Sequence, residues 1–292
     1  MAIFDDNVDA LEVVEDHAKE VLALETRQAN KVISVYADVV KTLRQRLRSV
    51  PKDSFSAQQI RVTLMQLQGA IDALHGDLSD TIDIGATLMA KRGIRDLVEE
   101  VRTFNDEFNG AVQPVRLDLV QQAIETKSRL INQYQASIDA YSKGLRQTIS
   151  DGLMNMVVER VGPEVMYQRL IEDDGIGQFF EGEAWKVRRI VRTELAGMYG
   201  AAKQDSLERI AADEPLMRKT LYNPKDARTG ADSAWLQSQI DAGRSNGANY
   251  VMRPKVEDPF VYVWKGHRRV FLAPPDRPND RSILIPYHPS WD

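Results

Sequence analysis

The sequence predicts a mainly α-helical protein that ends in a smaller α+β module with a short β-hairpin. Apolar residues recur at helical spacing through most of the first half of the chain. Near the C-terminal end, short runs of β-branched and aromatic residues replace this periodicity. A chain of 292 residues is long enough for two or three modest domains. We therefore expect a helical arm or bundle over 1–114, the helical part of a second module over 115–212, and an α+β part over 213–292.

Four helices are predicted in the first half of the chain. The first spans 6–48 and ends before Pro51. The second begins at the capping box of Ser56 and Gln59 and ends at a break over 75–80. The third is expected over about 82–107, kinked or split at its glycines, and the fourth over about 115–149, after a turn at 109–114.

Long helices with short connections are typical of antiparallel hairpins or of an elongated bundle. The apolar stripes on these helices are thin, because Gln, Asp, Lys and Arg occupy many positions. Thin stripes fit extended helical arms or oligomeric assemblies. A monomeric bundle with a solvated outer face fits them equally well.

Short helices broken by glycine and proline are expected over 150–180, followed by one helix over about 182–212. The predicted buried line of this helix is Val191, Leu195, Met198 and Ala202, and the flanking line is Ile190, Glu194, Gly197 and Ala201. The small residues on the flank allow another segment to approach closely. We therefore expect Glu194 at a packed edge, where it needs a cationic or hydrogen-bonding partner, and we expect Arg228 to be that partner.

Short helices and strands are predicted in the last part of the chain. A turn at Asn223-Pro224 precedes a helix capped by Asp232 or Ser233. A β-hairpin is expected from strands over 260–264 and 268–272, joined by a turn at Lys265-Gly266. A third strand is expected over 282–286, after an irregular proline-rich connector over 273–280.

Composition limits the classes of protein that remain. The absence of cysteine excludes disulfides, thiol nucleophiles and thiolate metal sites, and it fits a protein made in a reducing cytoplasm. No run of apolar residues is long enough to span a membrane, and the acidic start does not resemble a secretion signal.

The net charge of −5 is unevenly distributed. The first 24 residues contain seven acidic residues and one lysine, whereas residues 253–281 contain seven basic residues and four acidic ones. An acidic start and a basic end suggest different partners for the two ends, and a solvated surface with no special target explains them as well.

Recognised catalytic motifs are absent from the sequence. It has no phosphate-binding loop, no dinucleotide fingerprint, no HExxH and no GxSxG. Its four histidines, including His17, are far apart, and a metal site built on His267, His288 and Asp280 has no support from ligand spacing. We therefore expect no catalytic residue, no cofactor and no metal site.

One basic run lacks any acidic residue and can contact phosphates. It contains Lys186, Arg188, Arg189 and Arg192. Together with Arg268 and Arg269 in the predicted hairpin, its first three members are candidates for contact with nucleic acid or a protein partner. Apolar residues interleave with the run, so ion pairing inside the protein is the favoured interpretation of its charges.

Two segments resemble a known family. The run RRIVRTELAGMYGAAKQ (188–204) resembles the "IxRTE" helix of phage head morphogenesis proteins, the Mu F-like minor head proteins. The run DARTGADSAWLQ (226–237) resembles the "DxRT" segment that follows that helix in the family. The matching positions are Arg192, Thr193 and Glu194 in the first motif and Asp226, Arg228 and Thr229 in the second. The order of the motifs agrees too, and the resemblance covers roughly residues 120–292.

The sequence departs from the family pattern in two places. Ser233 stands near the position where many relatives have histidine. The closing Pro-x-His-x-x-Cys-Arg-Cys of the family is replaced by a cysteine-free segment in which Asp280-Arg281 stands near the Cys-Arg. A metal-binding role of that segment is therefore not expected here.

The resemblance implies a virion assembly protein of a tailed phage. Such a protein is a minor capsid component that associates with the portal and the major capsid protein inside the prohead, and some members accompany DNA into the host. Our first hypothesis is therefore a structural, non-enzymatic minor head protein, with homo-oligomers and DNA contact left open.

Two alternatives come from other classes. The first is a DNA-binding packaging or ejection factor that uses the candidate basic residues. The second is an enzyme, such as a nuclease or transferase, with a site formed by Glu194, Asp226, Arg228 and His288.

Overall fold

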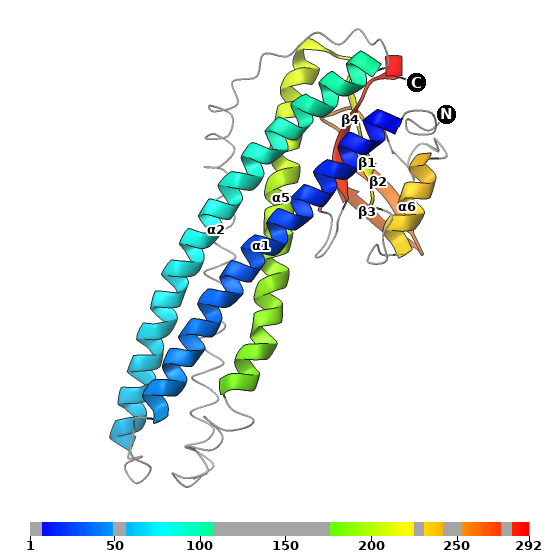
Figure 1. Cartoon of the computed structure of the whole chain (residues 1–292). Helices are drawn as coiled ribbons and strands as arrows, with labels where there is room; N and C mark the ends of the chain where they lie inside the picture. Colours follow the sequence, from blue (N-terminus) through cyan, green and yellow to red (C-terminus); the bar gives the residue numbers. More distant parts are fainter. Residues whose placement is uncertain are drawn as a thin grey trace. The chain divides into compact units, whose positions relative to one another are not determined.

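The computed structural model describes residues 8–48, 57–107, 176–224, 231–241, 253–275 and 282–291. Within these ranges the protein is mainly helical with small antiparallel sheets, as the sequence predicts. The helices are α1 (Val8–Arg48), α2 (Ala57–Glu107), α5 (Ile176–Asp213), α6 (Ala231–Asp241) and the short 3-10 helix η3 (Pro289–Trp291) (Figure 1). The strands are β1 (Arg218–Tyr222), β2 (Phe260–Trp264), β3 (His267–Phe271) and β4 (Ile283–Tyr287).

The chain divides into two compact units, each of which contains discontinuous segments. Unit 1 contains Met1–Thr26, Gly85–Leu130 and Arg192–Asp292, and unit 2 contains Arg27–Ile84 and Ile131–Val191. The helices α1, α2 and α5 therefore contribute residues to both units. The boundary predicted at 114 lies outside the described residues, and the predicted three-part division stays a prediction.

The core of unit 1 begins where α1, α2 and α5 pack together. Buried apolar side chains come from each helix, among them Val14, Leu97 and Leu207. The buried line predicted for α5 is confirmed, since Val191, Leu195, Met198 and Ala202 are each at most 2% exposed. At the C-terminal side of this core, the rings of Phe104 and Trp291 meet edge to face with centroids 5.5 Å apart.

Close approach of backbones requires glycine at two helical positions of unit 1. A Cβ atom on Gly93 of α2 would lie 2.7 Å from the carbonyl oxygen of Tyr199 in α5. A Cβ atom on Gly200 of α5 would collide with the carbonyl oxygen of Pro274. Another segment does approach α5, at Pro274 and Pro275, but the tight contact is at Gly200 rather than on the predicted flank, where a Cβ atom on Gly197 would lie 3.8 Å from Pro275.

Substitution of Gly200 by alanine is expected to lower the free energy of unfolding by about 1–3 kcal/mol, because the new methyl group forces a backbone shift in a packed region. Gly76→Ala is the matched control, since a Cβ atom there meets nothing within 4 Å. Removing that helical glycine should stabilise the protein by roughly 0.5–1 kcal/mol. Urea unfolding of both variants measures the effects, and a Gly200→Ala protein as stable as the wild type would contradict the packing described.

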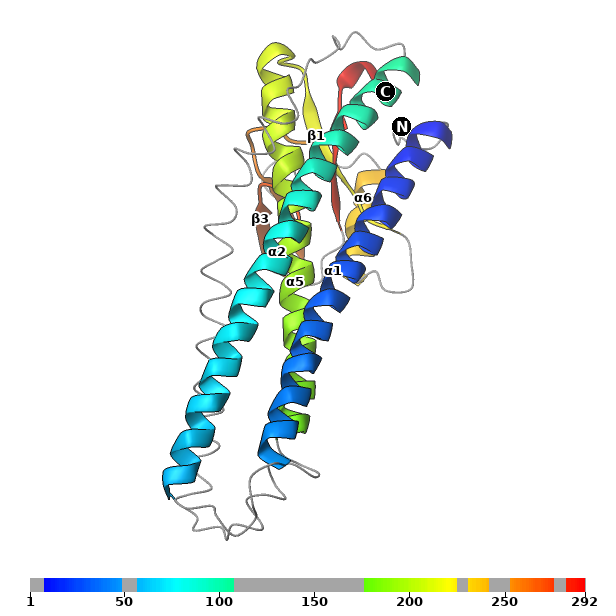
Figure 2. The same cartoon turned by 60° about the vertical axis from the view of Figure 1, so that its left-hand side comes forward.

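The strand β1 follows α5 after a short turn, in which the Met217 N–H donates to the Glu214 carbonyl at 3.0 Å, and runs back along the helix (Figure 2). It pairs antiparallel with β4, with Leu221 opposite Leu284. The third predicted strand is thus confirmed as β4. Its partner β1 was not predicted from the sequence.

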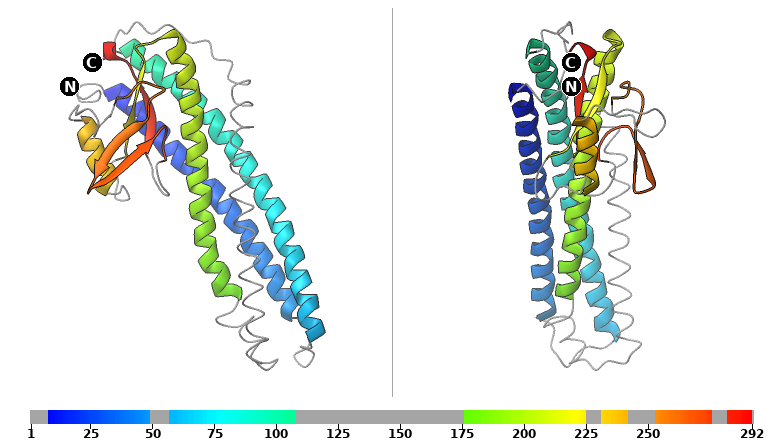
Figure 3. Two further views of the ribbon diagram at one scale, coloured as in Figure 1. Left: turned by 180° about the vertical axis from the view of Figure 1, so that it is seen from behind. Right: turned by 90° about the vertical axis from the view of Figure 1, so that its right-hand side faces the viewer.

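The predicted hairpin is confirmed as β2 and β3, with Phe260 opposite Phe271 and β3 beginning one residue earlier than expected. Lys265 and Gly266 both have positive φ angles, 47° and 82°, which suit a two-residue turn between twisted strands. The hairpin lies beside α6 (Figure 3), where the rings of Trp235 and Trp264 are 5.0 Å apart.

Several predicted boundaries are wrong. The helix α2 continues through 75–80, where a break was expected, and through its glycines. The helix α5 begins at Ile176 rather than near 182, and α6 begins at Ala231, before both of its predicted caps. The turn at 109–114, the fourth helix over 115–149 and the short helices before 176 lie outside the described residues. None of the described helices is both long and apolar enough for a membrane span.

Candidate functional site: a buried polar cluster between three helices

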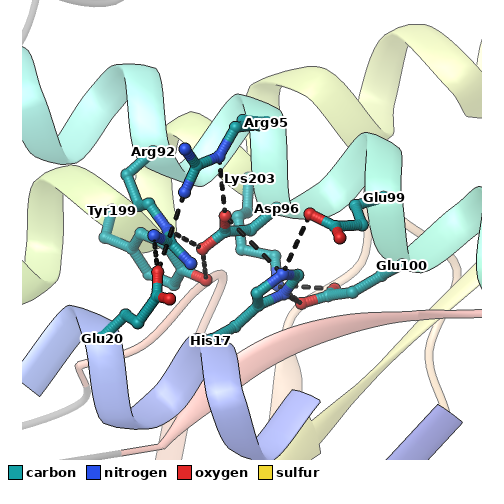
Figure 4. Close-up of polar contacts among 9 residues, drawn as sticks. All are labelled: His17, Glu20, Arg92, Arg95, Asp96, Glu99, Glu100, Tyr199 and Lys203. Carbon is teal, nitrogen blue, oxygen red and sulfur yellow. Dashed lines mark hydrogen bonds and ion pairs between the residues drawn. The ribbon is translucent and has the colours of Figure 1, made fainter. Parts of the chain in front are cut away.

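A polar cluster lies where α1, α2 and α5 meet in unit 1 (Figure 4). It consists of His17 and Glu20 from α1, Arg92, Arg95, Asp96, Glu99 and Glu100 from α2, and Tyr199 and Lys203 from α5. The α2 members recur at intervals of three and four residues, which places them on one face of the helix. The cluster therefore joins three segments that are far apart in the sequence.

The most deeply buried part of the cluster is an ion pair between α2 and α5. The Lys203 ammonium donates to both carboxylate oxygens of Glu100, at 2.6 Å each. Both side chains are fully buried. The ammonium also lies 5.4 Å from the centre of the Tyr199 ring, so its charge is compensated by a carboxylate and an aromatic face.

Asp96 connects α2 to α5 through one of its oxygens. Its Oδ2 accepts hydrogen bonds from Arg92 Nε at 2.6 Å and from the Tyr199 hydroxyl at 3.1 Å. Arg92 also pairs with Glu20 of α1. Burial, together with the charges of Glu100 and Asp96, raises the pKa of Tyr199 well above its usual value of 10.0, which keeps the hydroxyl protonated as a donor.

His17 faces carboxylates with both ring nitrogens. Its Nδ1 lies 3.0 Å from Glu100 Oε1, and its Nε2 lies 3.3 Å from Glu99 Oε2 and 3.8 Å from Asp96 Oδ1. Ionised carboxylates only accept hydrogen bonds, whereas a neutral imidazole has one donor and one acceptor nitrogen. Each ring nitrogen of His17 therefore faces a carboxylate oxygen that can only accept a hydrogen bond.

A surface groove of about 410 Å³ opens next to this histidine. It is lined by Glu12, Val13, Asp16, His17, Glu20, Arg92, Arg95 and Glu99. The second oxygen of Asp96, Oδ1, is buried and accepts no hydrogen bond from the described residues, and Arg95 Nε lies 3.5 Å from it. The cluster thus combines buried ion pairs in its interior with the imidazole of His17 and the carboxylate of Glu99, which line the groove.

Residues of the first predicted motif lie on α5 at the edge of unit 1. Arg192 is half-buried, and its Nη2 donates to the Thr26 hydroxyl of α1 at 3.4 Å. Thr193 and Glu194 are also half-buried. Burial raises the pKa of Glu194 above its usual value. Asp226, Arg228 and Thr229 lie outside the described residues, so the pairing of Glu194 with Arg228 stays a prediction.

This pairing predicts that Glu194→Ala lowers the free energy of unfolding by about 1–3 kcal/mol at pH 7, since the substitution leaves Arg228 without its partner. Arg228→Ala should have a similar effect, and the double variant should lose less than the sum of the two. Thermal or urea unfolding of the three variants gives the comparison. A Glu194→Ala protein as stable as the wild type would count against the pair.

The candidate basic residues belong to different units. Arg188 and Arg189 are exposed on the unit 2 part of α5, which also contains Lys186, whose side chain lies outside the described residues. Arg268 and Arg269 are exposed on β3 in unit 1. The hairpin therefore presents its own basic surface, next to exposed Lys265 and His267.

The two C-terminal histidines differ in their surroundings. His267 is exposed on β3, whereas His288 is buried. The Nδ1 of His288 accepts a hydrogen bond from the Ser290 N–H at 3.1 Å, and its Nε2 lies 3.5 Å from a carboxylate oxygen of Glu214. His288 is thus held by the backbone of Ser290 and faces one carboxylate, that of Glu214.

Lys219 of β1 is a second buried cation that the sequence analysis missed. Its ammonium donates to Gln204 Oε1 at 3.1 Å and to the Leu272 carbonyl at 2.9 Å, and it lies 5.2 Å from the centre of the Phe260 ring. These partners are all uncharged. Burial lowers the pKa of Lys219 from 10.5 to about 8.

Comparisons of the chain with protein-family models, with curated proteins and with solved structures found no match. The function is therefore argued from the residues of this chain and from the two motif segments.

Proposed function

We propose that the chain is a structural minor head protein of a tailed phage, which associates with the portal and the major capsid protein during head assembly. The observation that carries the proposal is the pair of motif segments at 192–194 and 226–229, in the order and approximate spacing of the Mu F-like minor head proteins. The first segment lies on α5, a helix whose neighbouring glycines admit another segment of the chain.

The arrangement of charges in unit 1 supports a structural role. The buried carboxylates of Asp96 and Glu100 are both engaged by cations or hydroxyls from another part of the cluster. Buried ionic networks of this kind can specify one packing of helices among several alternatives. In this proposal the cluster holds the ends of α1, α2 and α5 in a fixed arrangement.

The helical first half is proposed to form an arm, as a hairpin or elongated bundle over 1–114, that docks on portal or capsid. Isolated helices gain most of their stability from packing, so docking would stabilise such an arm. In unit 2 the exposed side chains of Met65 and Ile84 are apolar surface available for this contact.

Binding of the purified full chain to the portal protein of the same genome tests the proposal. Sedimentation velocity should show a complex, and Met65→Ser with Ile84→Ser should weaken it. Leu216→Ser is a matched control, since Leu216 is an exposed apolar residue of unit 1. A chain that sediments alone in the presence of both portal and proheads would contradict the proposed function.

DNA binding is a second candidate, favoured by the exposed basic residues of the β2–β3 hairpin. Neutralisation of phosphates by these residues would make the affinity fall steeply with salt. Replacing both Arg268 and Arg269 by glutamate should then abolish DNA binding. The same change at Arg188 and Arg189 measures whether the exposed arginines of unit 2 contribute to the DNA affinity. Affinity that is independent of salt and of all four arginines would exclude this candidate.

A further inference from the structure

We propose that His17 Nε2, Asp96 Oδ1 and Glu99 Oε2 bind a divalent metal ion of the zinc class, which connects α1 to α2 at the edge of the polar cluster. The three atoms all lie within 4.8 Å of one another. This inference goes beyond the proposed assembly function and does not depend on it.

The spacing of these atoms suits a first-row ion. Zinc forms bonds of about 2.0–2.1 Å to imidazole nitrogen and to carboxylate oxygen, so two ligand atoms of a tetrahedral site lie about 3.3 Å apart. Here the imidazole nitrogen lies 3.3 Å from the Glu99 oxygen and 3.8 Å from the Asp96 oxygen. One imidazole and two carboxylates form a mixed nitrogen and oxygen ligand set of the kind that zinc accepts.

The second oxygen of Asp96 accepts no hydrogen bond from the described residues and is therefore available to a ligand. Asp96 is fully buried, and its Oδ1 has no hydrogen-bond partner among the described residues. A buried carboxylate oxygen that accepts no hydrogen bond is costly. Its sister oxygen is already held by Arg92 and Tyr199, so the carboxylate is fixed with Oδ1 toward the imidazole.

The hydrogen bond on the other side of the ring prepares His17 as a ligand. Its Nδ1 lies 3.0 Å from Glu100 Oε1, and this carboxylate oxygen accepts a hydrogen bond from the Nδ1–H. A histidine that donates through one nitrogen presents the other nitrogen unprotonated to a metal, and a carboxylate acceptor increases its basicity. Glu100 would therefore act as a positioning residue, itself held by Lys203.

The charge balance leaves room for a cation. The cluster has four carboxylates and three Lys or Arg side chains, and the groove is also lined by Glu12 and by Asp16, which pairs with Lys19 at 2.9 Å. The nearest competitor is Arg95, whose Nε lies 3.5 Å from Asp96 Oδ1. Its side chain is 57% exposed and can turn into solvent when an ion binds. Because the groove is open, water can complete the coordination.

Titration of the metal-free full chain with Zn²⁺ by calorimetry tests the site. We expect one ion bound per chain. Co²⁺ bound in place of Zn²⁺ should give the visible absorption bands of an ion with a low coordination number. Zn²⁺ should also raise the melting temperature of the protein.

The decisive variant is Glu99→Gln, because this side chain is 49% exposed and its replacement does not disturb the core. Its affinity for Zn²⁺ should fall by about tenfold or more, since even outer-shell changes cost about 10–100-fold. Glu12→Gln in the same groove and His267→Gln on β3 are matched controls that should bind as the wild type does. His17→Gln should abolish binding, and if that variant does not fold, Glu99→Gln decides alone.

Arg95→Ala gives a test of opposite sign, since removing the competing cation should tighten Zn²⁺ binding several-fold. The proposal is overturned if the wild type binds no Zn²⁺ at micromolar concentrations. It is also overturned if Glu99→Gln binds as well as Glu12→Gln, or if Arg95→Ala leaves the affinity unchanged, because the ion would then lie elsewhere.

Discussion

Replacing Lys203 by methionine is expected to lower the free energy of unfolding by about 3–5 kcal/mol, because it leaves a buried carboxylate without its cation. Lys203 and Glu100 are both fully buried, and each oxygen of Glu100 accepts a hydrogen bond from the ammonium. The methionine retains most of the volume of the lysine stem, so the loss reports on the charge rather than on a cavity.

Urea unfolding monitored by circular dichroism gives the measurement. Lys91→Met is the matched control, since Lys91 is exposed on α2, and its effect should be within about 0.5 kcal/mol of zero. Adding Glu100→Gln to Lys203→Met should recover part of the lost stability, because the double variant no longer buries an unpaired carboxylate. A Lys203→Met protein as stable as Lys91→Met would show that the pair does not hold α2 against α5.

The stability of the protein is expected to rise between about pH 8 and pH 10 through Lys219. Burial lowers the pKa of this lysine in the folded protein from 10.5 to about 8. In that range the unfolded chain binds a proton at Lys219 that the folded protein has released, so the free energy of unfolding increases with pH. The lowered pKa changes the free energy of unfolding by about 3 kcal/mol in total. The protein is destabilised by this full amount below pH 8, where the buried lysine is protonated.

Comparison with Lys219→Met isolates this contribution. The variant loses hydrogen bonds to Gln204 and to the Leu272 carbonyl, which changes its stability at every pH. The difference between wild type and variant should nevertheless move in favour of the wild type by about 2–3 kcal/mol as the pH rises from 7.5 to 10. A difference that is constant over this range would contradict a buried lysine with a lowered pKa.

Much of the local structure could be predicted because it depends on neighbouring residues. The buried line of α5 follows from apolar spacing, and the β2–β3 hairpin follows from strand residues on both sides of Lys265-Gly266. The break expected over 75–80 was wrong because one glycine does not end a helix: Gly76 lies in α2 with open space around it. Its cost of about 1 kcal/mol is small for a helix of 51 residues.

The strand β1 was missed for a different reason. Its sequence RKTLY is short and contains Lys219, which normally indicates an exposed position. Here the lysine is buried because Gln204 of α5 and the carbonyl of Leu272 supply hydrogen-bond acceptors. Its pairing partner β4 lies more than sixty residues further along the chain, and no local pattern specifies such a contact.

The polar cluster could be anticipated only in part. The spacing of Arg92, Asp96 and Glu99 predicts one charged face of α2, and such faces are usually solvated. Its burial depends on residues that lie 83 and 103 positions from Glu100, namely His17 and Lys203. The sequence analysis treated His17 as an isolated histidine, because nothing in one sequence shows which helices come together.

Purification of proheads from cells that co-express this chain with the portal and major capsid proteins of the same genome tests the proposed function most directly. Quantitative mass spectrometry of the particles gives the number of copies per prohead. The account predicts that the chain is present at a low and constant copy number and is lost from particles assembled without the portal. Recovery of the chain only as free protein in the lysate, with none in the proheads, would contradict it.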